Sequence, residues 1–209
     1  MAIHMLHDLT LGLLLGTSAG FAPGPLLALV IAETLRHGIS SGVKVALAPL
    51  VTDAPIIILT VYILSRLSAF GTLLGVISLA GGLFVVYLGC KNFSAQKVDD
   101  DVRNARPQSL FKGIVVNFLN PHPYLFWFGV GAPIVSRATA KGWGAPFAFI
   151  GSFYLCLVGA KIVLALITSR SASFLSGRIY IYIMRFLGVA LMVLGLFLCR
   201  DGFRLLGAG

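Results

Sequence analysis

Long apolar stretches that carry almost no charge divide the sequence, and short clusters of charged residues separate them. Only 11% of the 209 residues are charged, whereas ordinary soluble domains contain about 25% charged residues. Most stretches are as long as the roughly 20 residues that an α-helix needs to cross the bilayer core. This pattern excludes a soluble enzyme, a disordered chain and a nucleic-acid binder. It predicts an all-α integral membrane protein.

Six apolar stretches follow one another, and each predicts one transmembrane helix. They are Leu9–Ala32, Val45–Leu64, Leu67–Cys90, Gly113–Ser136, Gly142–Ser169 and Ile179–Cys199. The connections that remain, of which Lys91–Lys112 is the longest, are too short for a water-soluble domain. We therefore expect residues 1–209 to form one transmembrane domain, with Glu33 marking the start of the first connection.

The basic residues predict the orientation of these helices. The connections between spans 1 and 2, 3 and 4, and 5 and 6 carry ten Lys and Arg residues: Arg36, Lys44, Lys91, Lys97, Arg103, Arg106, Lys112, Arg170, Arg178 and Arg185. The opposite side carries five: Arg66, Arg137, Lys141, Arg200 and Arg204. Because cytoplasmic connections are enriched in Lys and Arg, this count predicts that both termini lie outside.

Short patterns recur in the two halves of the chain. Leu74-Gly75-Val76 recurs as Leu187-Gly188-Val189 and Gly82-Leu83-Phe84 as Gly195-Leu196-Phe197, and both pairs share one sequence offset. Pro23-Gly24-Pro25 is matched by Pro121-His122-Pro123 at a second, shorter offset. Halves of about 1–97 and 98–209 would each hold three spans, and an odd number of spans inverts the second half. The sequence thus predicts an inverted 3+3 repeat, with chance similarity between Leu- and Gly-rich helices as the alternative.

The prolines predict that helices 1 and 4 are broken inside the membrane. At about 1.5 Å per residue, Pro23 and Pro25 lie roughly 21–24 Å into span 1, and Pro121 and Pro123 roughly 12–15 Å into span 4. Proline removes a backbone donor, and membranes tolerate unpaired backbone only where protein or a water-filled cavity satisfies it. Half-helix ends carry partial charges that a zwitterionic substrate could pair with, although a kink that serves packing alone is the alternative.

Polar side chains gather near the second break, where Asn117, Asn120 and His122 interrupt an apolar span. The titration range of histidine suits a proton relay, but a neutral His122 bonded to a freed carbonyl is equally compatible with the sequence. Asparagine also serves helix association by bonding to a neighbouring helix. The sequence alone leaves these readings open.

Two charges inside spans are the strongest functional signals. Asp53 lies eight residues from the start of span 2, and Lys161 lies eight residues from the end of span 5. In the predicted orientation both ends are cytoplasmic, so the two charges are expected at similar heights. Such residues usually line pathways or pair with each other. The alternatives are a structural ion pair for Asp53 and, for Lys161, a side chain extended to the membrane surface.

Several motifs together resemble the lysine exporter (LysE/RhtB) family. They are Ala22-Pro23-Gly24-Pro25, Leu35-Arg36-His37-Gly38 with Gly42, Asp53, Tyr87-Leu88-Gly89, and Asn117-Phe118-Leu119-Asn120-Pro121. The resemblance implies a multi-pass exporter of the inner (cytoplasmic) membrane that moves amino acids or related metabolites and is driven by an ion gradient. It also implies a homodimer, since members are often dimeric. The family commonly has lysine after Asn-Pro, where this chain has His122 followed by Pro123.

The functional prediction is therefore a secondary exporter, not an enzyme, that needs no cofactor. Its predicted substrate and ion pathway comprises Pro23, Gly24, Pro25, Asp53, Asn117, Asn120, Pro121, His122 and Lys161. We expect a proton as the coupling ion, and Asp53 to gain and lose it. The alternative is a cadmium-type metal-ion exporter, although a metal site would need more carboxylates or soft ligands than Asp53 provides. An electron carrier is disfavoured because Cys90, Cys156 and Cys199 lie far from the prolines, and a hydrolase because no nucleophile motif is present.

Overall fold

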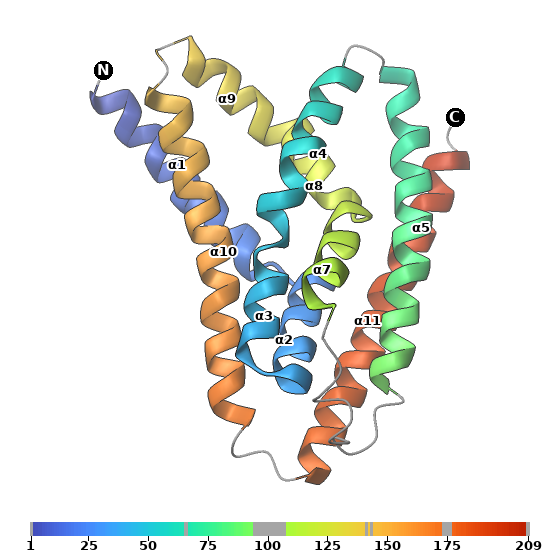
Figure 1. Cartoon of the computed structure of the whole chain (residues 1–209). Helices are drawn as coiled ribbons and strands as arrows, with labels where there is room; N and C mark the ends of the chain where they lie inside the picture. The colour runs from blue at the N-terminus through green and yellow to red at the C-terminus, as the bar shows by residue number, and fades with distance from the viewer. Residues whose placement is uncertain are drawn as a thin grey trace.

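The computed structural model of the chain (Figure 1) describes residues 2–64, 67–93, 108–140, 142, 144–172 and 177–207. Within these ranges the chain is helical and contains no strand, as predicted. The first half contains α1 (Ala2–Phe21), α2 (Pro25–His37), α3 (Ile39–Ala46), α4 (Ala48–Leu64) and α5 (Leu67–Phe93). The second half contains α7 (Ser109–Phe118), α8 (Pro121–Phe126), the π-helix η1 (Trp127–Gly131), α9 (Ala132–Thr139), α10 (Gly144–Ala172) and α11 (Gly177–Gly207).

Four helical segments of the described chain are long and apolar enough to cross a membrane: Ile39–Ile58, Thr72–Phe93, Gly144–Ser171 and Ile181–Gly207. A fifth is obtained if α1 and α2 count as one span, although they are bent by 62° at the link between them. The fourth predicted span is divided among α7, α8, η1 and α9, and none of these pieces is long enough alone. Six spans therefore stay a prediction, and the boundary proposed at residues 97 and 98 lies outside the described residues.

Helix breaks occur at both proline sites. The helix α1 ends at Phe21, and α2 begins at Pro25 with Gly24 as an extended N-cap residue. The helix α7 ends at Phe118, and α8 begins at Pro121. At this second break the Asn120 side chain accepts a hydrogen bond from the His122 amide at 3.1 Å, and so it caps α8.

The prediction that Glu33 marks a connection is wrong. Glu33 is 3% exposed and lies inside α2, which continues to His37. The connection to α3 is Gly38 alone, whose φ of 83° is strained for other residues. The physical reason is the helix break. A new helix begins at Pro25 and continues for about three turns, so Glu33 lies within this helix and not in a connection after it. Lys112, predicted in the long polar connection, likewise lies in α7, and residues 94–107 of that connection lie outside the described part.

The helices α5 and α11 pack side by side through glycines (Figure 1). Three pairs face each other across the contact: Gly75 with Gly202, Gly82 with Gly195, and Gly89 with Gly188. A Cβ atom on Gly82 would lie 2.7 Å from the Gly195 carbonyl oxygen, and a Cβ on Gly195 would lie 2.7 Å from the Gly82 oxygen. Small residues allow backbones to approach closely where lipid supplies no hydrophobic driving force.

We expect Gly82→Ala to destabilise this contact by about 1–3 kcal/mol, because the added methyl group overpacks against backbone that cannot move aside. The measurement is the thermal unfolding midpoint of the purified protein in detergent. Gly151→Ala is the matched control, because the structure leaves open space around Gly151. An unchanged midpoint in Gly82→Ala would contradict the close packing.

A second close contact joins α1 and α10. Gly12, Gly16 and Gly20 recur every four residues along α1, and each faces α10 so closely that a Cβ would overlap it. Gly24, which continues the spacing, has open space around it because the chain has left the helix there. On their outer faces the long helices expose large apolar side chains such as Leu155 and Phe186, each 72% exposed. Exposed apolar surface of this kind is typical of helices that face lipid.

Candidate functional site

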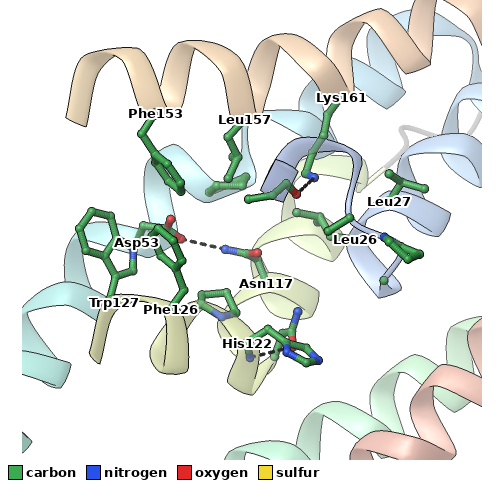
Figure 2. Close-up of a pocket in the computed structure, with 17 residues that line it drawn as sticks. Leu26, Leu27, Asp53, Asn117, His122, Phe126, Trp127, Phe153, Leu157 and Lys161 are labelled. Carbon is green, nitrogen blue, oxygen red and sulfur yellow. Dashed lines mark hydrogen bonds between the residues drawn. The ribbon is translucent and has the colours of Figure 1, made fainter. Parts of the chain in front are cut away.

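A cavity of about 310 Å³ lies between the two helix breaks (Figure 2). Seven of the nine predicted pathway residues line it: Pro23, Gly24, Asp53, Asn117, Asn120, His122 and Lys161. The other two, Pro25 and Pro121, do not line the cavity and are the first residues of α2 and α8. Residues that are far apart in the sequence are therefore brought together by the folding of the two broken segments.

Asp53 is 4% exposed and receives several hydrogen bonds at one side of the cavity. Its Oδ1 accepts from the Asn117 amide at 3.0 Å and from the Thr52 hydroxyl at 3.3 Å. Its Oδ2 accepts from the Tyr154 hydroxyl at 2.9 Å. Hydrogen bonds favour the ionised carboxylate and burial favours the neutral acid. The protonation state of this carboxyl group therefore depends both on its hydrogen bonds and on its burial.

Lys161 binds the end of a half-helix. It is 4% exposed, and its Nζ donates to the Gly20 carbonyl at 2.8 Å and to the Ala19 carbonyl at 3.4 Å (Figure 2). The Ala19 oxygen would normally accept from the residue four positions later, but that residue is Pro23, which has no N–H. A cation at the C-terminal end of α1 also matches the negative end of the helix dipole. Lys161 thus replaces a donor that the break removes, and it does not extend to the membrane surface.

Asp53 and Lys161 line the same cavity but do not form an ion pair within 4 Å. Each is satisfied by a different broken segment, Asp53 by Asn117 of α7 and Lys161 by the carbonyls of α1. The alternative of a structural ion pair between them is therefore wrong for this conformation. The lining of the cavity thus contains one carboxylate and one ammonium group that are not paired with each other.

We expect Lys161→Met to lower the free energy of unfolding by about 1–3 kcal/mol, because it leaves the Ala19 and Gly20 carbonyls without a donor. The thermal unfolding midpoint in detergent measures this change. Lys44→Met is the matched control, since Lys44 is exposed on α3. Equal midpoints for the two variants would show that Lys161 does not stabilise the end of α1.

His122 lies at the exposed edge of the cavity. Its backbone amide donates to Asn120, whereas neither ring nitrogen of this residue forms a hydrogen bond with another described residue. Asn120 is 8% exposed and Asn117 4% exposed, so both asparagines are buried beside the break. Asn117 bonds to Thr52 at 2.6 Å as well as to Asp53, which joins α7 to α4.

Sequence reasoning missed three residues around Asp53. Tyr154 of α10 and Thr52 of α4 donate to its carboxylate, and Trp127 of η1 lines the cavity beside it (Figure 2). The Trp127 side chain is buried, and its indole interacts with the Asp53 carboxylate and with Tyr154. No signal in the sequence separates these residues from the other aromatic and hydroxyl residues of the spans. A π-helical turn such as η1 often occurs at functional sites.

A buried ion pair was also missed. The Lys112 ammonium donates to Glu33 Oε1 at 2.6 Å, and the Ser109 hydroxyl donates to Glu33 Oε2 at 2.6 Å. The Glu33 side chain is 4% exposed and that of Lys112 is 18% exposed. The pair joins α2 to the first turn of α7, so it links the two broken segments away from their breaks.

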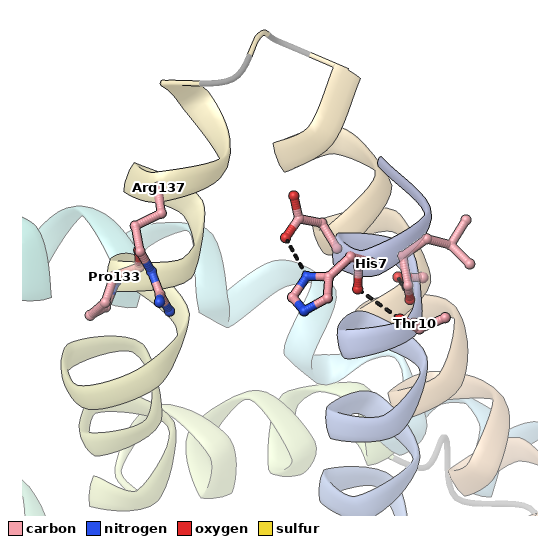
Figure 3. A network of polar contacts seen from close by, with 7 residues as sticks. His7, Thr10, Pro133 and Arg137 are labelled. Atoms are coloured by element: carbon pink, nitrogen blue, oxygen red, sulfur yellow. Dashed lines mark hydrogen bonds and ion pairs between the residues drawn. The ribbon is translucent and has the colours of Figure 1, made fainter. Parts of the chain in front are cut away.

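A smaller polar group lies near the N-terminus of α1 (Figure 3). Asp8 is 4% exposed, its Oδ1 lies 3.5 Å from Nδ1 of His7, and its Oδ2 has no partner among the described residues. On α9, which Figure 3 also shows, Arg137 donates to the carbonyl of Pro133 at 3.3 Å. These contacts are local to their helices and lie outside the cavity lining.

The described residues contain no group of three His, Cys, Asp or Glu side chains that could hold a metal ion. Within the cavity the metal-binding side chains are Asp53 and His122, and His122 lies at its edge.

Comparison with known proteins identifies one family. The sequence model described as LysE type translocator matches residues 17–202, which covers both helix breaks and all the cavity residues. A comparison with curated proteins finds no match, and a comparison with solved structures finds none either.

Proposed function

Since this chain belongs to the LysE type translocator family, we propose that it is a secondary exporter of amino acids or related small metabolites. The family consists of transporters, and the apolar helices indicate a multi-pass membrane protein. We further propose that export across the cytoplasmic membrane is coupled to protons and that Asp53 is the residue that binds them. The small molecule and the proton are the partners of this function, together with the lipid bilayer and a second copy of the chain.

The observation that carries this proposal is the cavity between the two breaks. It contains a buried carboxylate and a buried ammonium group, which are partners for the two charged groups of a zwitterion. The half-helix α2 also begins there, since Gly24, Leu26 and Leu27 line the cavity. The first N–H groups of a helix have no partner inside it and favour anions. Transporters with broken helices use such ends for substrate carboxylates.

We propose that the fold is an inverted 3+3 repeat of six spans. Gly82 and Gly195 hold equivalent places in the repeated Gly-Leu-Phe pattern and face each other, so they would lie on the two-fold axis that relates the halves. The same sequence offset makes Gly75 equivalent to Gly188 and Gly89 equivalent to Gly202. The axis would exchange these equivalent glycines, and so it would exchange the two outer glycine contacts. The contacts beside the central pair agree with this two-fold axis. Gly82 faces Cys199, and Gly195 faces Val86. The same offset makes Val86 and Cys199 equivalent.

The two helix breaks also support the inverted repeat. They follow the shorter of the two sequence offsets, which makes Pro23 equivalent to Pro121. Ala19, whose carbonyl Lys161 binds, and Asn117, whose amide binds Asp53, are equivalent at this offset. Each lies four residues before the first proline of its break. In each half, therefore, a buried charged side chain of another helix bonds to the residue four positions before the first proline of the break.

A transport assay in liposomes tests the proposed function. Purified protein is reconstituted, an outward or inward pH gradient is imposed, and movement of a panel of radiolabelled amino acids is followed. We expect transport of at least one panel member that depends on the gradient and is abolished by a protonophore. The metal-exporter alternative is tested by including cadmium in the panel. Transport of cadmium alone would overturn the amino-acid proposal.

The orientation is a separate prediction. Figure 1 shows both chain ends at one end of the molecule, whereas the α2–α3 junction and the facing ends of α10 and α11 lie at the other. We expect the end that carries more Lys and Arg to face the cytoplasm, so both termini lie outside. Fusions to the C-terminus give the measurement: alkaline phosphatase should be active there and a cytoplasmic fluorescent reporter should not. The reverse pattern would contradict the predicted orientation.

A further inference from the structure

We propose that the cavity takes a single zwitterionic amino acid whose side chain is neutral and apolar, in preference to one with a cationic side chain. This inference rests on the proposed export of amino acids and specifies the substrate class of the same site. It follows from the charges, the wall and the size of the cavity.

The charges of the lining match one zwitterion. Its described residues include one carboxylate, Asp53, and one ammonium group, Lys161, with the imidazole of His122 as the remaining titratable group at the exposed edge. The ammonium and carboxylate of an amino acid use both charges. A lysine or arginine substrate carries one further cation, for which the described lining offers no second carboxylate. A second cation would be buried without a counter-charge, which is strongly unfavourable.

The rest of the lining forms an apolar wall, which we define as Leu26, Leu27, Phe126, Trp127, Phe153 and Leu157. The aromatic members support one another. The rings of Phe126 and Phe153 are stacked, with centroids 4.9 Å apart, and Trp127 packs edge-on against Phe153 at 5.9 Å. Such contacts fix the positions of the rings. A fixed apolar wall favours an aliphatic or aromatic side chain over a polar one, because burial of a polar group without a partner is costly.

The volume of the cavity is compatible with a substrate of the size of one amino acid. Ligand pockets usually measure about 300–1,000 Å³, and the cavity of about 310 Å³ is at the lower end of that range. This size is sufficient for leucine or phenylalanine.

The test is a counterflow assay in proteoliposomes with leucine inside and radiolabelled leucine outside. Unlabelled leucine, isoleucine, phenylalanine, threonine, lysine, arginine and glutamate compete in turn. We expect leucine, isoleucine and phenylalanine to compete at concentrations about tenfold or more below those of lysine and arginine. If leucine counterflow is absent, labelled lysine is used in its place. Transport of lysine but not leucine would overturn this inference and leave the proposed export of amino acids standing, whereas transport of no panel member would overturn both.

A pair of variants tests the charge argument. Leu27 is half-buried in the apolar wall, in the first turn of α2, where an acidic residue is compatible with the helix dipole. We expect Leu27→Glu to supply the missing counter-charge and to improve competition by lysine relative to leucine by about tenfold. Leu27→Gln is the neutral control of matched size. It should weaken competition by leucine without improving competition by lysine. Equal effects of the two variants on lysine would contradict the argument.

Binding can be followed without transport. The chain has two tryptophans, Trp127 in the wall and Trp143 outside the described residues. In a Trp143→Phe background, the fluorescence of Trp127 reports occupancy of the cavity. We expect leucine to change the emission at concentrations about tenfold below those at which lysine does. A response to lysine at the lower concentration would overturn the proposal even if a Leu27 variant fails to fold.

Discussion

Asp53→Asn is expected to abolish transport driven by a pH gradient while the protein still folds and inserts. Asparagine is similar in size and can keep part of the hydrogen bonding with Asn117, Thr52 and Tyr154, but it cannot gain and lose a proton. The proposed substrate carries no net charge, so exchange with protons that move down their gradient is the proposed source of the free energy for its accumulation. Without proton exchange nothing supplies that free energy, so uptake in proteoliposomes with an imposed pH gradient should fall to the level of empty liposomes.

The matched control for this variant is Asp201→Asn, because Asp201 is an exposed aspartate near the end of α11. It should transport like the wild type. Size-exclusion profiles and thermal unfolding of both variants separate loss of coupling from loss of folding. Gradient-driven transport at the wild-type rate in Asp53→Asn would remove Asp53 from the coupling step, and His122 would be the next residue to test.

Glu33→Gln is expected to lower the free energy of unfolding by about 3 kcal/mol. Removing one member of a buried ion pair typically costs about 3–5 kcal/mol, because the other charge is left without a partner. The lower end of this range applies here, since the Lys112 side chain remains 18% exposed and keeps some contact with water. The measurement is chemical or thermal unfolding in detergent, followed by far-ultraviolet circular dichroism.

The double variant Glu33→Gln/Lys112→Met provides the control for this prediction. Removing both charges leaves no unpaired ion, so the double variant should be more stable than Glu33→Gln alone. If the two variants are equally destabilised, the contribution of Glu33 comes from its bond to Ser109 and not from the ion pair.

Much of the fold could be predicted because lipid imposes simple requirements on a sequence. Apolar length identified four long helices of the described chain. The paired prolines marked both breaks, whereas the single Pro55 lies inside the uninterrupted helix α4. The division of span 4 into four short helices could not be predicted. It depends on contacts such as the Tyr124 hydroxyl donating to the Phe118 carbonyl at 2.8 Å, which only the folded chain brings together.

The sequence revealed the charged residues of the candidate site but not its aromatic residues. Asp53 and Lys161 stand out because a charge in an apolar stretch is rare and costly. Tyr154 does not, because a tyrosine in a membrane helix fits the lipid surface equally well, and its partner Asp53 lies far away in the sequence. Glu33 was misplaced because an acid next to Arg36 and His37 at the end of an apolar stretch has the pattern of a helix end. Its partner Lys112 lies in a distant segment that was predicted to be a loop.

The glycine contacts have a consequence for how the cavity can open. Backbones that touch without intervening side chains have no rotamers with which to adjust, so α5 with α11, and α1 with α10, should each move as one rigid body. The cavity residues of α10 and α1 belong to one of these bodies, whereas Asp53 and Asn117 lie on α4 and α7 between the two. The bond from Tyr154 of α10 to Asp53 of α4 crosses that boundary. We therefore expect the protonation state of Asp53 to set how firmly α10 is attached to α4, and so to connect proton binding directly with the movement of one body against the other.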